Sequence, residues 1–115
     1  MKVLDTSVLV HGPDRSFDDA AVVHEVVEEV ESRGARRALR LADPRVLSPQ
    51  SSSIERVRRQ ASELNYNFSE ADKASAALAL DRSAQLVSDD KPLLSMCDRL
   101  GVDAQGYTVS RANRR

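Results

Sequence analysis

The sequence predicts an α/β domain of three layers, with a mostly parallel central sheet and helices on both faces. Short apolar stretches of strand-like composition alternate along the chain with longer stretches of helical periodicity. Two of the apolar stretches, 1–5 and 85–88, run directly into carboxylates. The chain has 115 residues, of which 41% are hydrophobic and 30% charged, a composition that suits one globular core. We expect one domain over residues 1–109, followed by a basic flexible tail over residues 110–115.

The first half of the chain is predicted to hold three short strands separated by helices. Valines at helical spacing between positions 22 and 30 form one apolar stripe, and Gly34 is expected to break or kink the chain before a basic helix. The predicted elements are a strand over 1–5, a helical turn over 8–10, a strand over 20–23, a helix over 22–30, a helix over 35–42 and a strand over 45–47.

The second half shows clearer helix boundaries. Pro49 and the serines at 51–53 predict a turn and an N-cap for a helix over 54–64. Ser69 and Asp72 have the spacing of a capping box at the start of an Ala- and Leu-rich helix over 71–80, which should be well buried. A strand over 85–88, a helix from Pro92 to a glycine cap at Gly101, and a last short strand within 102–109 complete the prediction.

Composition excludes several classes of protein. The net charge of −1 gives no general attraction to nucleic acid, and the single cysteine, Cys97, rules out an internal disulfide and a cysteine-based zinc ribbon in this chain. No apolar run approaches the roughly 20 residues of a membrane-spanning helix, so a cytoplasmic protein without membrane contact is expected. A glycine-rich turn after the first strand and a P-loop are both absent, which argues against dinucleotide or nucleotide binding.

Acidic residues stand at the ends of two predicted strands, those over 1–5 and 85–88. Asp5 and the pair Asp89 and Asp90 stand just past the carboxyl ends of their strands, and such ends meet at one edge of a parallel sheet. Glu29 and Asp72, expected near helix N-terminal regions on that edge, can join them. Helical phase places Glu29 beside the valine stripe, whereas Glu28 points nearly opposite.

Simpler roles for these acids stay open at this point. Asp5 can act as a cap for the helical turn that follows it, and Asp72 can do no more than stabilise the start of its helix. However, carboxylates gathered in one cleft repel one another unless a cation lies among them. The expected cation is Mg²⁺ or Mn²⁺, which prefer oxygen ligands, and such an ion equips a site for phosphodiester hydrolysis.

Four segments of the chain, in order, resemble the motifs of the PIN-domain ribonucleases. They are LDTSVLV at the start, EVVEEV, FSEADKASAALAL, and LVSDDKPLLSMCDRLGV. The order and spacing are most similar to the Nob type, which matures the 3′ end of small-subunit ribosomal RNA, although the zinc ribbon of that type is absent here. The resemblance implies a PIN-like fold and cleavage of single-stranded RNA with Mg²⁺ or Mn²⁺.

The resemblance also implies a role for each site residue. Asp5, Glu29, Asp72 and Asp90 would form the metal-binding, catalytic set, with Asp89 as a neighbour of uncertain role. Ser7 and Ser88 match the hydroxyl positions that steady the residues bound directly to the metal. Three arginines, if they share the acidic edge, are candidate contacts to RNA phosphates: Arg36, Arg37 and Arg40.

The expected function is therefore a metal-dependent endoribonuclease that acts in small-subunit rRNA maturation. Its expected partner is RNA, either precursor rRNA or the small ribosomal subunit, and a homodimer is left open. One alternative is a toxin-type ribonuclease held by an antitoxin. Another is a PIN module that binds RNA or protein without cleaving, for which loss of acidic positions would be the hallmark; none of the four is lost here.

Overall fold

The structure is a computed structural model that describes residues 1–10, 17, 19–30 and 33–107. The predicted basic tail over 110–115 lies outside the described residues. Among those that are described, no helix is long and apolar enough to cross a bilayer.

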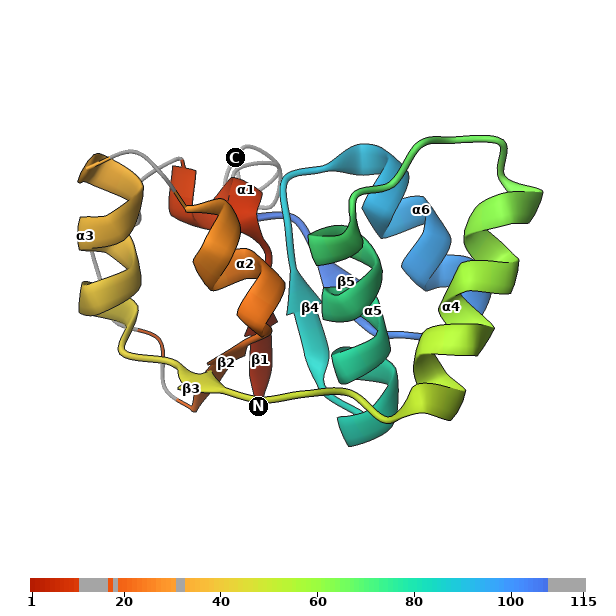
Figure 1. Ribbon diagram of the computed structural model, residues 1–115, viewed down its shortest axis with the longest axis horizontal. Helices are drawn as coiled ribbons and strands as arrows, with labels where there is room; N and C mark the ends of the chain where they lie inside the picture. The colour runs from red at the N-terminus through yellow and green to blue at the C-terminus, as the bar shows by residue number, and fades with distance from the viewer. Residues whose placement is uncertain (11–16, 18, 31–32, 108–115) are drawn as a thin grey trace, which may run out of the picture.

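Five short strands and six helices are found in the described parts of the chain (Figure 1). The strands are β1 (Lys2–Leu4), β2 (Ala20–Val22), β3 (Arg45–Val46), β4 (Gln85–Val87) and β5 (Ala104–Gln105). The helices are α1 (Thr6–Val10), α2 (His24–Glu29), α3 (Arg33–Ala42), α4 (Ser51–Glu63), α5 (Glu70–Arg82) and α6 (Lys91–Leu100).

The strands form one sheet in the order β3-β2-β1-β4-β5, and every pairing between them is parallel. The chain order reverses between β1 and β4, which pair through Lys2 with Gln85 and Leu4 with Val87. In open α/β sheets, ligands bind outside the carboxyl ends of the strands at such a reversal. Figure 1 shows β1 rising from the N-terminus to α1, so this edge is at the top of that view.

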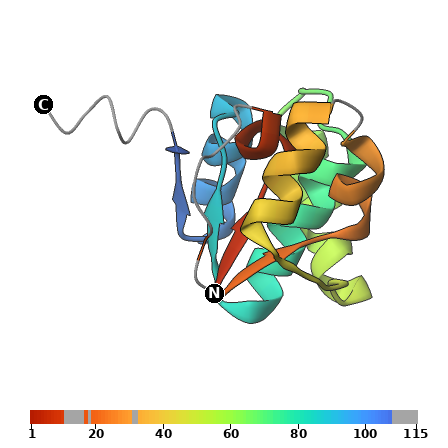
Figure 2. The same cartoon turned by 90° about the vertical axis from the view of Figure 1, so that its left-hand side faces the viewer.

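The helices pack against the sheet and against one another. Helix α5 contacts both β1 and β4, and it also contacts α2, α4 and α6, while α1 contacts α3 and α6 contacts β5. In Figure 2, α6 and β5 lie toward one side of the molecule and α2, α4 and α5 toward the other. The fold is therefore the α/β fold expected, with a sheet that is parallel throughout.

Strand β1 is held at the centre of the core. Val3 and Leu4 are fully buried, as are Leu86 in β4 and Leu78 in α5. Burying aliphatic side chains of this size stabilises the fold by about 1.5–3 kcal/mol each. The position of β1, and of the residue that follows it, is thus fixed by packing on both sides.

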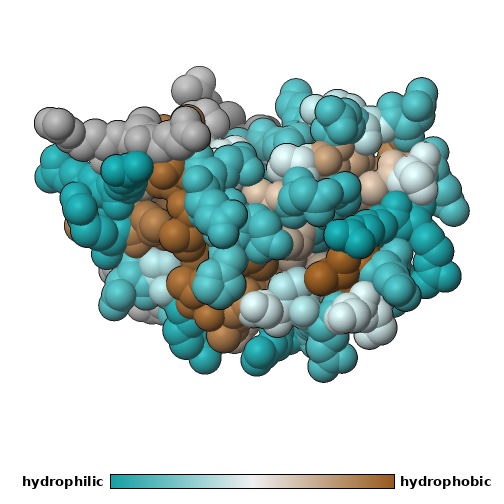
Figure 3. All heavy atoms as spheres, in the orientation of Figure 1, coloured by the Kyte–Doolittle hydropathy of each residue, from teal (hydrophilic) through white to brown (hydrophobic). Residues whose placement is uncertain are grey.

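A hydrophobic patch lies on the surface near the edge strand β3. Figure 3 shows apolar side chains reaching the surface between α2 and α3 and toward β3. Val27, Leu41 and Val46 are exposed there.

Two predictions about helix starts are wrong. Gly34 lies inside the first turn of α3 and does not break it, because a glycine costs a helix only about 1 kcal/mol relative to alanine; the chain leaves α2 at Val30, whose backbone is extended. The serines at 51–53 belong to α4 itself, whose N-cap is Gln50, with no capping bond from its side chain. Asp81 of α5 instead accepts hydrogen bonds from the Gln50 backbone N–H and from Ser53.

Candidate active site

Asp5 occupies the first position after β1, at the point where the strand order reverses. Its carboxylate is buried, with 1% of the residue exposed, and its backbone N–H donates to the carbonyl of Val87 at 3.1 Å. Since Leu4 pairs with Val87, the next residues along each strand, Asp5 and Ser88, are brought side by side. The sheet register alone therefore places a carboxylate against a serine 83 positions away.

Two hydroxyl groups hold one oxygen of this carboxylate. Ser7 Oγ donates to Asp5 Oδ2 at 2.9 Å, and Ser88 Oγ donates to the same oxygen at 2.8 Å. The two hydroxyl oxygens are 3.3 Å apart. Among the described residues, the other oxygen, Oδ1, is buried and has no hydrogen-bond partner. The donors found are side-chain hydroxyls and not the N–H groups of α1, so the role of Asp5 as a simple helix cap is not supported.

The same two hydroxyls also shape the loop after β4. The Asp89 backbone N–H donates to Ser7 Oγ at 2.9 Å, and the Asp90 backbone N–H donates to Ser88 Oγ at 3.0 Å. Asp90 is the N-cap of α6, where its Oδ1 accepts from the Leu93 N–H at 3.4 Å. Ser7 and Ser88 thus join the ends of β1 and β4 in one network that orients both Asp5 and Asp90.

A cleft of about 380 Å³ opens at this edge of the sheet and contains the four predicted acids. Asp5 comes from the end of β1, Asp90 from the start of α6, and Asp72 from the first turn of α5. Glu29 is the last residue of α2, so its expected place near a helix N-terminus is wrong, although it does line the cleft. Glu28 and Glu29 are both exposed, but of the two only Glu29 lines the cleft.

The carboxylates raise one another's pKa values in this cleft. Burial and then repulsion from Asp5 raise the pKa of Asp72 from 3.8 to about 6, although the capping bonds with Ser69 oppose the shift. Burial and repulsion from Asp5 also raise the pKa of Glu29, and burial raises that of Asp90. A group of acids that disfavours its own ionisation in this way favours a bound cation.

Asp72 caps its helix and also lies at the cleft. Its backbone N–H donates to Ser69 Oγ at 3.0 Å and its Oδ2 accepts from the Ser69 N–H at 3.2 Å, which completes the capping box. The same side chain lines the cleft with Asp5 and Asp90. The cap fixes the carboxylate at the helix start, and the position of α5 against β1 brings it to the site.

Other predicted residues lie away from the cleft. Asp89 is not among the described residues that line it; its backbone N–H takes part in the network through Ser7. Arg36, Arg37 and Arg40 are exposed on α3 and do not line the cleft either. Helix α3 contacts α1, which follows Asp5, and Arg36 Nε donates to the Val30 carbonyl at 3.5 Å. Their role as phosphate contacts stays a prediction.

The structure adds residues that sequence reasoning missed. Thr6, Val10, Tyr66 and Asn67 also line the cleft. The Thr6 hydroxyl lowers the pKa of Glu29, but burial and repulsion from Asp5 have larger effects, so the pKa is raised overall. Thr6 Oγ1 makes no hydrogen bond of regular geometry with a described residue. Tyr66 and Asn67 belong to the loop between α4 and α5, three and two residues before the N-cap Ser69.

The acids suit a hard divalent ion with a water shell rather than a closed cage. Among the described residues, no three His, Cys, Asp or Glu side chains stand close enough to hold one ion between them. However, Mg²⁺ usually keeps several waters and binds through one or two carboxylates, which this cleft offers. The buried Asp5 Oδ1, which lacks a partner among the described residues, fits that requirement, since a buried carboxylate oxygen is costly without a donor or a cation.

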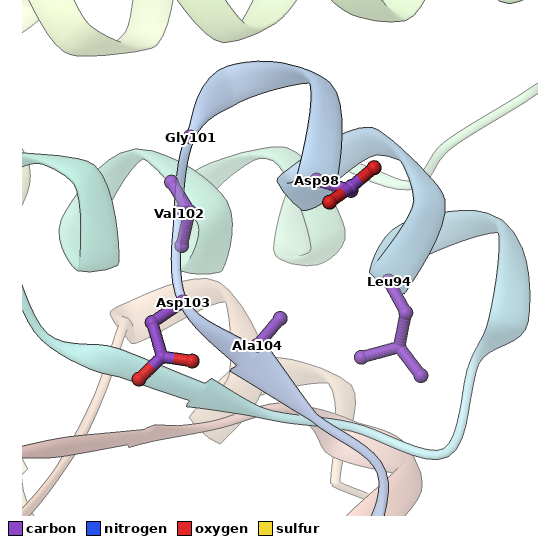
Figure 4. A pocket seen from close by; sticks show the side chains of 6 residues that line it. All are labelled: Leu94, Asp98, Gly101, Val102, Asp103 and Ala104. Atoms are coloured by element: carbon purple, nitrogen blue, oxygen red, sulfur yellow. The ribbon is translucent and has the colours of Figure 1, made fainter.

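A second hollow, of about 370 Å³, lies between α6 and β5 and shows no comparable convergence (Figure 4). Its two acids, Asp98 and Asp103, stand on different segments and do not point toward each other in that view. Asp103 precedes β5, at the amino end of a parallel strand, and its Oδ2 accepts from Gln85 Nε2 at 3.5 Å. The cleft beyond the carboxyl ends of the strands is therefore the candidate active site.

Known proteins share sequence or fold with this chain. The chain is 28% identical over 118 aligned positions, 99% of its length, to the protein named Endoribonuclease Nob1 of Methanocaldococcus jannaschii, and it spans 60% of the length of that relative. No protein-family model matches the chain. A solved PilT N-terminus domain protein from Sulfolobus solfataricus P2 shares the fold with a TM-score of 0.54 at 15% identity, over 91% of this chain and 85% of that one. The chain is therefore similar in sequence to part of a protein named Endoribonuclease Nob1, and similar in fold to a PilT N-terminus domain protein.

Proposed function

We propose that the protein is a metal-dependent endoribonuclease that hydrolyses single-stranded RNA, in the maturation of small-subunit rRNA. The observation that carries the proposal is the cleft at the sheet edge where Asp5, Glu29, Asp72 and Asp90 meet. The likeness to a protein named as an endoribonuclease supports RNA as the substrate. The rRNA role rests on the resemblance to the Nob type alone.

Each of the four acids would contribute differently to holding Mg²⁺ or Mn²⁺. Asp5 is fixed by two hydroxyls on Oδ2, so its Oδ1 is held in one orientation for an ion or for a metal-bound water. Asp72 and Asp90 sit at helix starts, which fixes them by their caps. When bound, such an ion would neutralise phosphate charge and lower the pKa of a water.

The residues of the chain themselves position the reacting groups. Without a bound cation the pKa of Asp72 is raised to about 6, and a cation in the cleft would favour its ionised form, which can then bind the ion or orient a water. Glu29, whose pKa is raised as well, lies in the same cleft. The hydrogen bonds from Ser7 and Ser88 keep Asp5 from turning away, because a lone carboxylate could rotate out of position.

The test is cleavage of a fluorescent single-stranded RNA with Mn²⁺ by the wild type, Asp5→Asn and Glu29→Gln. Glu28→Gln is the matched control, because Glu28 is the neighbour on the same helix that does not line the cleft. We expect cutting by wild type and Glu28→Gln, and a loss of at least a hundredfold in Asp5→Asn and Glu29→Gln. Intact RNA with wild type, or equal cutting by Asp5→Asn, would overturn the proposal.

The toxin-type and non-cleaving alternatives remain predictions without a supporting observation of their own. A non-cleaving module would bind the RNA and leave it intact, so the same assay distinguishes it from a nuclease. Cleavage that depends on sequence context near a small-subunit rRNA 3′ end would separate the rRNA role from a toxin role. Cutting of unrelated messenger RNA with equal rate would count against the rRNA role.

A further inference from the structure

We infer that Tyr66 forms a nucleobase-stacking subsite at the rim of the acidic cleft, which receives one unpaired base of the RNA. This inference rests on the proposed function for its substrate class. It begins from an exposed aromatic ring: Tyr66 is 50% exposed and lines the same cleft as the four acids. A large ring left in water at the edge of a charged cleft is a surface on which a flat ligand can stack.

The ring is held in place rather than left free. Tyr66 packs against Phe68 with ring centroids 4.7 Å apart and planes tilted by 57°. Phe68 is itself 5% exposed and belongs to the core. One side of the Tyr66 ring is therefore held in place. The side chain then loses less conformational entropy when a base stacks on it.

The backbone of the loop keeps the ring at the cleft. Helix α4 ends before Asn65, whose φ of 51° lies in the left-handed region that asparagine tolerates. The Phe68 N–H then donates to the Tyr66 carbonyl at 3.1 Å, and Ser69 begins the capping box of α5. Tyr66 is thus fixed between two helix ends, three residues before a cap that also holds Asp72.

The surroundings of the ring match the chemistry of a base and not that of a phosphate. Val10, 63% exposed, and the amide of Asn67 line the cleft beside the acids. An apolar side chain offers contact to a base plane, and an amide offers both a donor and an acceptor to a base edge. Stacking of single-stranded bases on aromatic side chains is tolerant of sequence and stronger for larger rings. The subsite therefore favours an unpaired purine.

The chain allows a direct test because it contains no tryptophan. In Tyr66→Trp the new indole is the single tryptophan fluorophore, and a stacked base quenches its emission. The probe is a short oligoadenylate RNA, titrated in EDTA so that no cleavage occurs. Val46→Trp, at an exposed position on β3 outside the cleft, is the matched control.

We expect quenching in Tyr66→Trp, less with oligouridylate, and none in Val46→Trp. Fluorescence anisotropy of labelled RNA should show about tenfold weaker binding by Tyr66→Ala and unchanged binding by Tyr66→Phe, because the ring and not the hydroxyl carries the effect. Equal urea midpoints for these two variants would show that the Phe68 packing survives. Tyr66→Trp emission that stays constant under saturating RNA, or equal affinity of Tyr66→Ala and wild type, would overturn the inference.

The two proposals fail separately. Quenching without any cleavage in Mn²⁺ would support the stacking subsite and refute the proposed nuclease activity. Cleavage by wild type with no quenching, and with Tyr66→Ala as active as wild type, keeps the nuclease and removes the subsite.

Discussion

Replacing Asp72 by asparagine should stabilise the metal-free protein at neutral pH. The pKa of Asp72 is raised from 3.8 to about 6, so between these values the folded state binds more protons than the unfolded one, and stability falls as pH rises. At about 1.4 kcal/mol per pH unit, the shift corresponds to at most about 3 kcal/mol, which solvent screening of a partly buried group reduces to about 1–2 kcal/mol. The asparagine carbonyl can still accept from the Ser69 N–H, so the capping bond is kept.

The assay is urea unfolding in EDTA at pH 3.5, 5 and 7.5, with Glu28→Gln as the control. We expect Asp72→Asn to gain about 1–2 kcal/mol over wild type at pH 7.5, which is a rise in Tm of roughly 4–8 °C for a domain of this size. The gain should shrink toward pH 3.5, where Asp72 is protonated in the folded state and mostly protonated in the unfolded state. A variant that is less stable than wild type at pH 7.5, or a gain that does not change with pH, would refute the repulsion argument.

Three further outcomes follow from the same site. Mn²⁺ should raise the Tm of wild type and do so much less in Asp90→Asn, measured by differential scanning fluorimetry; an identical response in both would count against a shared metal site. Ser88→Ala removes a donor to Asp5 and the acceptor of the Asp90 N–H, so urea unfolding should show a loss of about 1–3 kcal/mol, and no loss would mean that the network is not needed for stability. Burial, with a smaller effect of Asp5, raises the pKa of the Cys97 thiol to about 12, so this cysteine should react with a thiol reagent at pH 8 only after unfolding; fast reaction of the native protein would contradict its burial.

Asp5 and the pair Asp89 and Asp90 could be found from the sequence because the relevant signal is local, whereas the choice of Asp90 within the pair came from the family resemblance. Each follows an apolar stretch that reads as a strand, and parallel strands must bring their carboxyl ends to one edge. Glu29 could be preferred over Glu28 by helical phase alone. The structure confirms that Asp5, Glu29 and Asp90 line one cleft.

The features that depend on tertiary packing could not be predicted from local sequence patterns. The S-x-x-D pattern gave Asp72 only a cap, since nothing in the pattern tells where α5 lies relative to β1. The serines at 51–53 favoured a cap that Asp81, a residue of another helix, makes unnecessary. Tyr66 was missed because a loop between two helices has no periodicity that would fix its direction.

The separation of the acids from Tyr66 along the chain has a consequence for engineering. The acids are attached to the sheet edge and to helix ends, whereas Tyr66 belongs to a short connection between α4 and α5. Residues 66 and 67 can therefore be exchanged as a cassette, provided that Asn65 is kept for its left-handed backbone, Phe68 as the core anchor and Ser69 as the cap. Under the two proposals made above, libraries built in these two positions would change base preference while the four acids stay untouched.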